Sequence, residues 1–241
     1  MSEICEALRA PRTALIVHAH PEPASFSTSQ MQVAASALRT AGYDVEILDL
    51  YATSWNAILD RHDFPGVDGY FKPQAEQMRA AAEGTLPTDV AEHLRALKRA
   101  DLLVLSFPLW WFSVPAILKG WIDRVFVMGE LFGGTKGLFD QAGLVGRQAI
   151  LLITTGGSEH AFTVNGGFGQ LDDLLLHVHH GMLRFVGYDV LQPVVTYGPV
   201  HLDQRARASA LGDVRAAFEA IDLRDSIPAL GDLPTTHLAA A

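Results

Sequence analysis

Short, predominantly apolar runs recur along the chain at intervals that leave room for a helix between them. Four of these runs predict buried parallel strands, because a strand covered on both faces of a sheet is apolar at every position. The four runs are Ala14–Val17, Val45–Leu48, Leu102–Ser106 and Ala149–Ile153. A fifth strand is expected over Val190–Thr196, where Pro193 weakens the pattern or places the strand near an edge of the sheet.

Between these runs, apolar residues recur every three or four positions, a spacing that predicts amphipathic helices. The pattern of Ser29–Thr40 is followed by Gly42 as a stop signal. In Thr88–Lys98, Thr88 is the expected N-cap residue. Further helices are predicted over Val114–Val127, Gln170–Phe185 and His201–Ile221. Alternating strands and helices predict right-handed βαβ units, and hence a doubly wound α/β fold with a parallel five-stranded sheet and helices on both faces.

The composition is typical of one globular domain and argues against several classes of function. The chain has 241 residues, of which 49% are apolar and 19% charged, so a sizeable core can be buried. The net charge of −9 argues against a nucleic-acid partner. Cys5 is the single cysteine, which excludes a disulfide framework within the chain and favours a cytoplasmic protein. The longest apolar region, Leu102–Val127, contains Lys119, Asp123 and Arg124, so no integral membrane segment is expected.

The loops that follow the strands carry the candidate site, because ligands bind at the carboxyl ends of the strands in an open parallel sheet. The first strand is followed by a hydroxyl-rich turn that runs from His18 to Ser29. Such a turn ahead of a helix offers hydroxyls, free backbone N–H groups and the positive end of the helix dipole, which together suit a phosphate. Ordinary N-capping by Ser27 or Ser29 explains the same residues equally well.

Two more loops are expected at the same edge of the sheet. Large aromatic residues fill the loop between Pro108 and Pro115, where they are poorly explained as core because loops run over the surface. They suit a flat aromatic ligand or a hydrophobic dimer interface, and the two interpretations are compatible. After the fourth strand, Gly156 and Gly157 allow close approach of the backbone to a ligand. The convergence of all three loops favours a flavin.

Four stretches of the sequence resemble the DT-diaphorase family, the NAD(P)H quinone dehydrogenases with a flavodoxin-like fold. They are Ala14–Ser27, Glu46–Ala52, Phe107–Phe126 and Ile153–Ser158. The resemblance extends from Thr13 to Arg215 and implies a flavodoxin-like domain over residues 13–222. The composition of residues 223–241 predicts a low-complexity tail. The activity it implies is two-electron, ping-pong hydride transfer from NADH or NADPH, through a bound flavin, to a quinone, nitroaromatic or azo compound.

The resemblance also implies which residues bind the flavin. The phosphates and ribityl chain would contact His20, Ser25, Phe26, Ser27 and Ser29. The isoalloxazine ring would lie against Pro108, Leu109, Trp110, Trp111 and Phe112. The pyrimidine edge of that ring would approach Thr154, Thr155, Gly156 and Gly157, and Phe162 is also expected to contact the cofactor. The N–H groups of the two glycines would stabilise charge on the ring. Lys72, in the long connection from Tyr51 to Pro87, would reach the adenine half of the cofactor, which favours FAD over FMN.

Two aromatic residues depart from the family's pattern. Phe162 stands where the family has a tyrosine and Phe168 where it has a histidine, a pair thought to stabilise the reduced flavin and to help protonate the quinone. His160 is the candidate substitute donor, because imidazoles titrate near neutral pH. A purely solvent-facing His160 is the alternative. Gly133 and Thr135 replace two tyrosines at the family's substrate mouth, which predicts a wider and less aromatic mouth.

A metal site is not expected from the histidines. His160, His177, His179 and His180 lack a standard zinc spacing, and Arg184 stands where some relatives have a metal ligand. These imidazoles are therefore interpreted as polar groups on a helix surface. The chain is expected to form a homodimer with active sites at the interface. Two other classes of function remain as alternatives, a flavodoxin-like electron carrier and a regulatory subunit of a membrane transporter.

Overall fold

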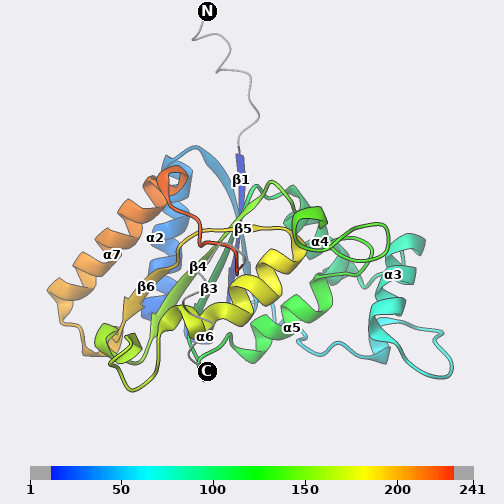
Figure 1. The fold of residues 1–241 in the computed structure, drawn as a ribbon, viewed down its shortest axis with the longest axis horizontal. Coiled ribbons are helices and arrows are strands. Elements are labelled where there is room, and N and C mark those ends of the chain that lie inside the picture. Colours follow the sequence, from blue (N-terminus) through cyan, green and yellow to red (C-terminus); the bar gives the residue numbers. More distant parts are fainter. Residues whose placement is uncertain (1–11, 231–241) are drawn as a thin grey trace, which may run out of the picture.

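Strands and helices alternate along residues 12–230, the residues that the computed structural model describes (Figure 1). The strands are β1 (Arg12–His18), β2 (Tyr43–Asp49), β3 (Leu102–Pro108), β4 (Gln148–Thr155), β5 (Asp189–Val190) and β6 (Val194–Tyr197). The helices are α2 (Phe26–Thr40), α3 (Pro73–Glu83), α4 (Thr88–Arg99), α5 (Ala116–Val125), α6 (Leu171–Val178) and α7 (Gln204–Glu219). Cys5 lies outside the described residues.

The strands form one parallel sheet in the order β2-β1-β3-β4-β5, with β6 also paired to β4. Successive residues of a strand pack on opposite faces of the sheet. In β3, Leu103 and Leu105 belong to the core on one side, and Leu102 and Val104 to the core on the other. Because both faces are covered, every residue of β3 is buried. This arrangement confirms the predicted doubly wound α/β fold.

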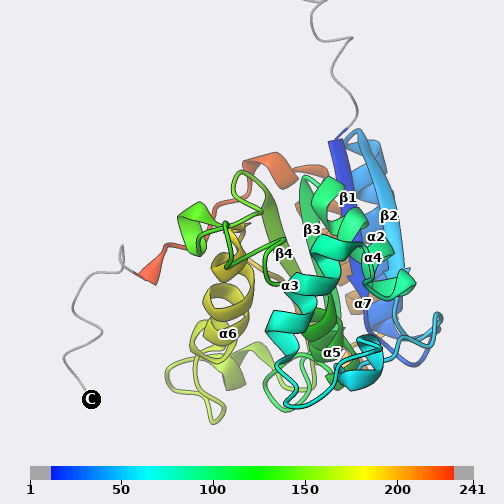
Figure 2. The same ribbon diagram turned by 90° about the vertical axis from the view of Figure 1, so that its right-hand side faces the viewer.

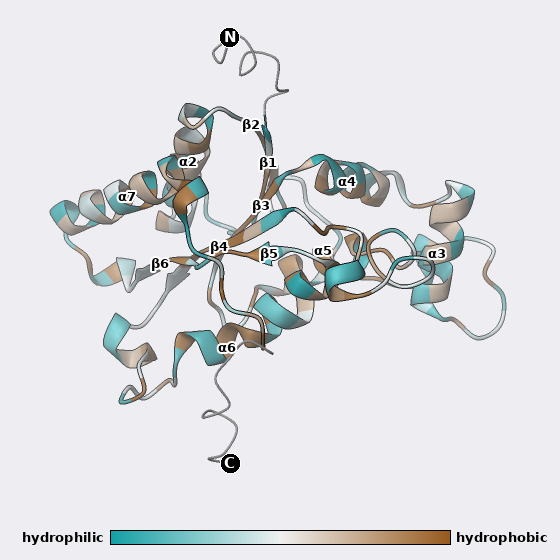
Figure 3. Cartoon of the chain, turned by 45° about the horizontal axis from the view of Figure 1, so that its top comes forward, coloured by the Kyte–Doolittle hydropathy of each residue, from teal (hydrophilic) through white to brown (hydrophobic). Residues whose placement is uncertain are grey.

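Two sets of helices cover the two faces of the sheet. The helices α2 and α7 pack together on one face, where Leu38 and Phe218 are fully buried. The helices α4, α5 and α6 cover the other face, where Leu97 and Trp121 lie in the larger core (Figure 3). In Figure 2, α3 and α4 face the viewer and α7 lies behind the sheet. The predicted helices on both faces are therefore confirmed.

The expected fifth strand over Val190–Thr196 is in fact two short strands, β5 and β6, so the sheet has six strands rather than five. Pro193 separates them, because proline has no N–H to donate to a ladder. Residues 225–227 cover part of this edge, where the N–H of Ile227 donates to the carbonyl of Val190 at 2.8 Å. Part of the segment expected to be a low-complexity tail therefore pairs with the edge of the sheet.

The helix α2 begins earlier than its apolar spacing predicts. Ser25 is the N-cap residue, and its Oγ accepts the N–H of Thr28 at 3.0 Å. Neither Ser27 nor Ser29, the predicted capping residues, takes that position, because the helix already starts at Phe26. The helix therefore begins three residues earlier than predicted. Two serines of the hydroxyl-rich turn, Ser27 and Ser29, lie inside it.

Two further predictions of helix boundaries need correction, and one helix was not predicted. Thr88 is not an N-cap but the first residue of α4, after Pro87. The helix expected over Gln170–Phe185 is α-helical only in α6, and it continues as a π-helical turn, η4 (His179–Leu183), and a 3₁₀ turn, η5 (Arg184–Val186). The connection between β2 and α4 contains a helix, α3, that no predicted element covers.

A buried ion pair fixes the connection between β2 and α3. Arg124 of α5 is 3% exposed, and its guanidinium donates to both carboxylate oxygens of Asp63 at 2.7 and 2.9 Å. The same guanidinium donates to the carbonyl of Asn56 at 2.9 Å and to Asp89 at 3.1 Å, and it lies over the ring of Trp55. These contacts hold the connection against α4 and α5.

Candidate active site

The loop after β3 forms a tight turn in a strained conformation. Trp110 and Ser113 exchange two backbone hydrogen bonds of 3.0 and 3.1 Å. The two residues between them, Trp111 and Phe112, have positive φ angles of 52° and 58°. Turns of this kind favour Asn and Gly, because a left-handed backbone costs other residues about 1–2 kcal/mol each. Trp111 is also 95% exposed, so a strained and uncovered aromatic turn lies at the end of a central strand, as is typical of ligand sites.

The loop after β1 presents the N-terminus of the 15-residue helix α2. Within the described residues, the N–H groups of Phe26 and Ser27 have no hydrogen-bond partner. Together with the hydroxyl of Ser25 and the positive end of the helix dipole, they suit a phosphate group. His20 flanks the turn, and its Nδ1 accepts the N–H of Glu22 at 3.0 Å.

The loop after β4 is bordered by aromatic rings. A Cβ atom added to Gly157 would lie 2.8 Å from Cε2 of Phe168, whereas one added to Gly156 would meet nothing within 4 Å. A side chain at position 157 would push the ring of Phe168 aside, whereas Gly156 leaves its backbone accessible. The ring of Phe162 packs on those of Phe168 and Phe112, with centroids 5.4 and 6.4 Å apart. In the described part of the chain, neither glycine N–H has a hydrogen-bond partner.

Direct contacts join the three loops into one surface. Ser27 Oγ lies 2.6 Å from Thr154 Oγ1, and both side chains are buried. The N–H of Leu109 donates to the carbonyl of Thr154 at 2.8 Å. The ring centroids of His20 and Trp110 are 6.2 Å apart. The predicted convergence of the loops is thus present in the structure, while the binding role of each residue stays a prediction.

A buried histidine at the first position of the predicted turn, for which the sequence predicts no role, supports this surface. His18 is fully buried at the end of β1, with Nδ1 3.1 Å from Ser106 Oγ and Nε2 3.1 Å from Thr28 Oγ1. The hydroxyl of Thr28 donates to the carbonyl of Glu22 at 3.1 Å, so its oxygen accepts from Nε2–H of His18. Burial lowers the pKa of His18, which keeps the imidazole neutral at neutral pH.

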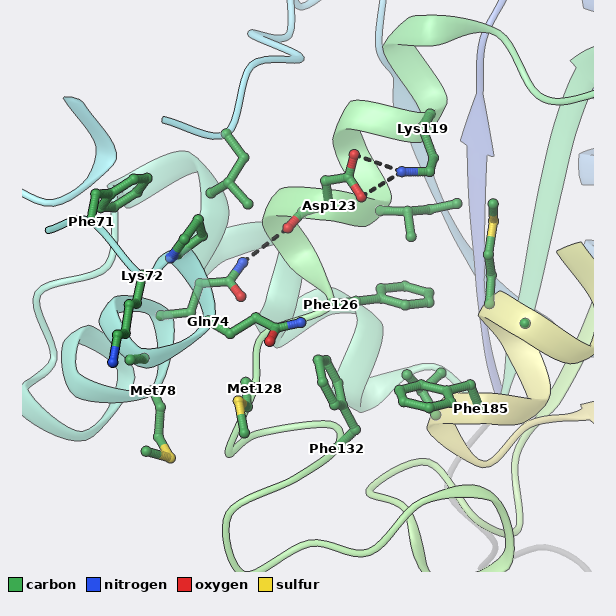
Figure 4. Close-up of a pocket in the computed structure, with 18 of the residues that line it drawn as sticks. Phe71, Lys72, Gln74, Met78, Lys119, Asp123, Phe126, Met128, Phe132 and Phe185 are labelled. Carbon is green, nitrogen blue, oxygen red and sulfur yellow. Dashed lines mark hydrogen bonds and ion pairs between the residues drawn. The ribbon is translucent and has the colours of Figure 1, made fainter. Parts of the chain in front are cut away.

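A cavity of about 910 Å³ lies between α3, α5 and the turns that follow α6 (Figure 4), and we call it the α3–α5 groove. Its lining is mainly apolar and includes Phe71, Met78, Phe126, Phe132 and Phe185. Lys72 lies on the α3 side of the groove, and Lys119 pairs with Asp123 at 2.7 Å on α5. The structure therefore places Lys72 on the groove, apart from the other predicted cofactor residues of the same chain.

The histidines at the end of α6 have different environments. His177 is exposed, and its Nε2 lies 2.8 Å from Ser113 Oγ. His179 is only 4% exposed, which corrects the interpretation of these imidazoles as surface groups, and burial lowers its pKa to about 4. His180 stacks on Phe139 with ring centroids 5.0 Å apart. Across residues 12–230, no three His, Cys, Asp or Glu side chains are arranged to hold a metal ion.

Three polar side chains near the loops complete the description. His160 lies in a 3₁₀ turn after β4 and is exposed, and its imidazole makes no hydrogen bond among the described residues. The hydroxyl of Ser29 donates to the carbonyl of Ser25 at 3.1 Å, so it turns back onto its own helix. Tyr197, which no motif marks, ends β6 with its ring 5.8 Å from that of Phe162, and burial raises the pKa of its phenol.

Comparison with known proteins identifies the class of this architecture. A family model described as flavodoxin-like fold matches residues 12–218. The solved structure of a "Putative quinone reductase" from Klebsiella pneumoniae has a TM-score of 0.85 and 34% identity, and the match covers 90% of this chain and 87% of that one. The chain is a flavodoxin-like α/β protein, as the sequence predicts.

Two curated relatives narrow the class. NAD(P)H dehydrogenase (quinone) 1 of Cavia porcellus is 36% identical over 89% of this chain and 78% of its own length. Ribosyldihydronicotinamide dehydrogenase (quinone) of Homo sapiens is 34% identical over 91% of this chain and 96% of its own. The chain belongs to the NAD(P)H dehydrogenase (quinone) family of oxidoreductases, which confirms the resemblance. Where the structure describes the chain, its helices are too short or too polar to cross a bilayer.

Proposed function

We propose that the chain is a flavin-dependent NAD(P)H oxidoreductase that transfers hydride to quinones or to related nitroaromatic and azo compounds. One observation carries the proposal: three loops meet at the carboxyl edge of the sheet and bring the strained aromatic turn together with the free N-terminus of α2. Family membership supports the same chemistry, since the relatives are named for NAD(P)H and quinone. The single cysteine favours a cytoplasmic location.

The three loops offer separate groups for the separate parts of a flavin. The free N–H groups of Phe26 and Ser27 suit its phosphate. The exposed Trp111 offers a large apolar face to its ring system. The N–H groups of Gly156 and Gly157, unpartnered in residues 12–230, suit the heteroatoms of the ring. When bound, the flavin supplies the capacity to accept and release a hydride, which protein side chains lack.

Residues of the chain then orient the reactants and manage charge and protons. With a flavin bound, the N–H groups of Gly156 and Gly157 would stabilise negative charge on its ring. The rings of Phe162 and Phe168 pack together beside these glycines and have no proton to donate. We propose His160 as the proton donor in their place. We propose that NAD(P)H and the acceptor use the same pocket in turn. The oxidised nicotinamide must then leave before the acceptor enters, which gives ping-pong kinetics.

We also propose that the enzyme is a homodimer that binds FAD. Trp111 and the apolar lining of the α3–α5 groove are adjacent hydrophobic surfaces, because His177 lines the groove and contacts the aromatic turn. We propose that one two-fold interface buries both surfaces, since they belong to a single patch of the subunit. Lys72 lies on the groove and does not contact the three loops of its own chain. The adenine half of FAD would therefore meet Lys72 of the partner subunit.

Release of the cofactor from the purified protein by acid, followed by chromatography, tests the proposal. We expect one FAD per chain. A colourless protein that gains no visible absorbance after incubation with FAD or FMN contradicts the proposed function, whereas FMN alone overturns only the choice of FAD. Rapid NADH or NADPH oxidation in the presence of a naphthoquinone separates the enzyme from an electron carrier, which lacks a nicotinamide pocket.

A further inference from the structure

The strained turn of residues 110–113 is held on two sides by one segment of the chain. The ring of Phe112 packs edge-on against that of Phe168, with centroids 5.5 Å apart. Ser113 Oγ lies 2.8 Å from Nε2 of His177, which belongs to α6. Phe168 lies just before α6 in the sequence, so both contacts come from the same segment. This segment therefore holds the turn that carries Trp111.

The contact between Ser113 and His177 is the one side-chain hydrogen bond that residues 110–113 make within the described part of the chain. Either partner can donate, because the hydroxyl can bond a bare Nε2 and Nε2–H can bond the hydroxyl oxygen. The contact therefore survives protonation of the imidazole. A hydrogen bond that persists in both charge states suits a positioning role better than a proton-donating one.

We propose that His177 is a positioning residue that acts through Ser113 to hold the aromatic turn in its left-handed conformation for cofactor binding. The inference rests on the proposed function and deepens it. Trp111 and Phe112 both have positive φ, which residues other than glycine rarely adopt. Without the contact, the turn spends part of its time in relaxed conformations. The cofactor then binds only the competent fraction, so its apparent affinity falls by that fraction.

A double-mutant cycle on the full chain, with FAD affinity measured by titration of the apoprotein, tests this inference. The variants are Ser113→Ala, His177→Ala and the double variant. One neutral hydrogen bond changes an equilibrium about two- to tenfold, so each single variant should raise the Kd for FAD by that factor. The double variant should raise the Kd no further, because both changes remove the same contact.

Two more variants separate positioning from a general effect on α6. His177→Gln places an amide within reach of the same hydroxyl and should restore the wild-type Kd. Leu176→Ala changes an exposed neighbour on the helix and should leave the Kd unchanged. The thermal midpoint of each apoprotein is measured in parallel, because a merely structural role would lower the midpoint at constant Kd.

The outcomes distinguish this inference from the proposed function. A lowered midpoint with an unchanged Kd, additive effects in the double variant, or no effect at all overturns the positioning role and leaves the proposed function intact. Failure of His177→Gln to restore affinity also counts against the role. Wild-type protein that binds neither FAD nor FMN overturns the proposed function, and the inference with it.

Discussion

Replacement of Trp111 by alanine should separate cofactor binding from folding. Trp111 is 95% exposed, so its side chain contributes almost nothing to the core. A tryptophan side chain buries about 150–250 Å² when fully covered. Contact of one face with a flat ring removes roughly 100 Å² from water, which at about 25 cal/mol per Å² corresponds to roughly 2–3 kcal/mol. We therefore expect Trp111→Ala to weaken flavin binding by about 1–3 kcal/mol, or about five- to hundredfold.

The assay pairs flavin titration of the apoprotein with its free energy of unfolding in urea. Trp111→Ala should change that free energy by less than about 0.5 kcal/mol, because alanine carries the same left-handed strain and the lost side chain is exposed. The control is Trp111→Gly, which should stabilise the apoprotein by up to about 1 kcal/mol, since glycine adopts positive φ freely. Unchanged flavin affinity in both variants would refute the packing of Trp111 against the cofactor.

Three further predictions concern stability and proton transfer. Arg124→Met leaves the buried carboxylate of Asp63 unpaired and should lower the free energy of unfolding in urea by about 3–5 kcal/mol, whereas a loss below about 1 kcal/mol would contradict the buried pair. The unfolded chain protonates His179 near pH 6.5 but the folded chain only near pH 4, so stability should fall by about 3 kcal/mol as pH drops through that window. His179→Leu should reduce the slope by the share of this one imidazole, whereas His18 and His93, whose pKa values burial also lowers, keep their own share. An equal slope in both proteins would disprove the contribution of His179. His160→Ala should slow quinone reduction about a hundredfold, with hydride transfer from NAD(P)H unchanged in stopped flow. An unchanged rate and pH profile would assign the proton to water.

The strands β1, β3 and β4 could be predicted because burial on both faces makes nearly every position apolar. The strand β2 was predicted as well, but it lies at an edge of the sheet and most of its residues are not buried, so the expectation of burial on both faces is wrong there. The same criterion fails over Val190–Thr196, where Pro193 interrupts the ladder and divides one predicted strand into two. The helix α3 carries two local signals, Pro73 at its first turn and Gly84 at its end with φ of 70°. Only two residues of α3 are buried, so its sequence lacks a clear helical spacing of apolar residues. The two local signals alone were not enough to predict the helix.

The candidate site could be predicted only as far as it lies in contiguous loops. Strand ends mark the three loops, and their convergence follows from the parallel topology. The left-handed turn at Trp111 and Phe112 could not be predicted, because neither residue type favours positive φ. The contact of Ser113 with His177 joins residues 64 positions apart and depends on how α6 packs against the turn. Such contacts are set by tertiary packing and leave no local pattern.

Anaerobic mixing of the flavin-loaded protein with NADH or NADPH, followed by one equivalent of a naphthoquinone, tests the central claim most directly. We predict that the visible flavin absorbance is lost in the first step and recovers fully in the second. Nicotinamide cofactor and quinone should be consumed in equal amounts, as two-electron transfer requires. Oxidation of NAD(P)H without loss of that absorbance, or a loss that the quinone does not reverse, would contradict hydride transfer through the flavin.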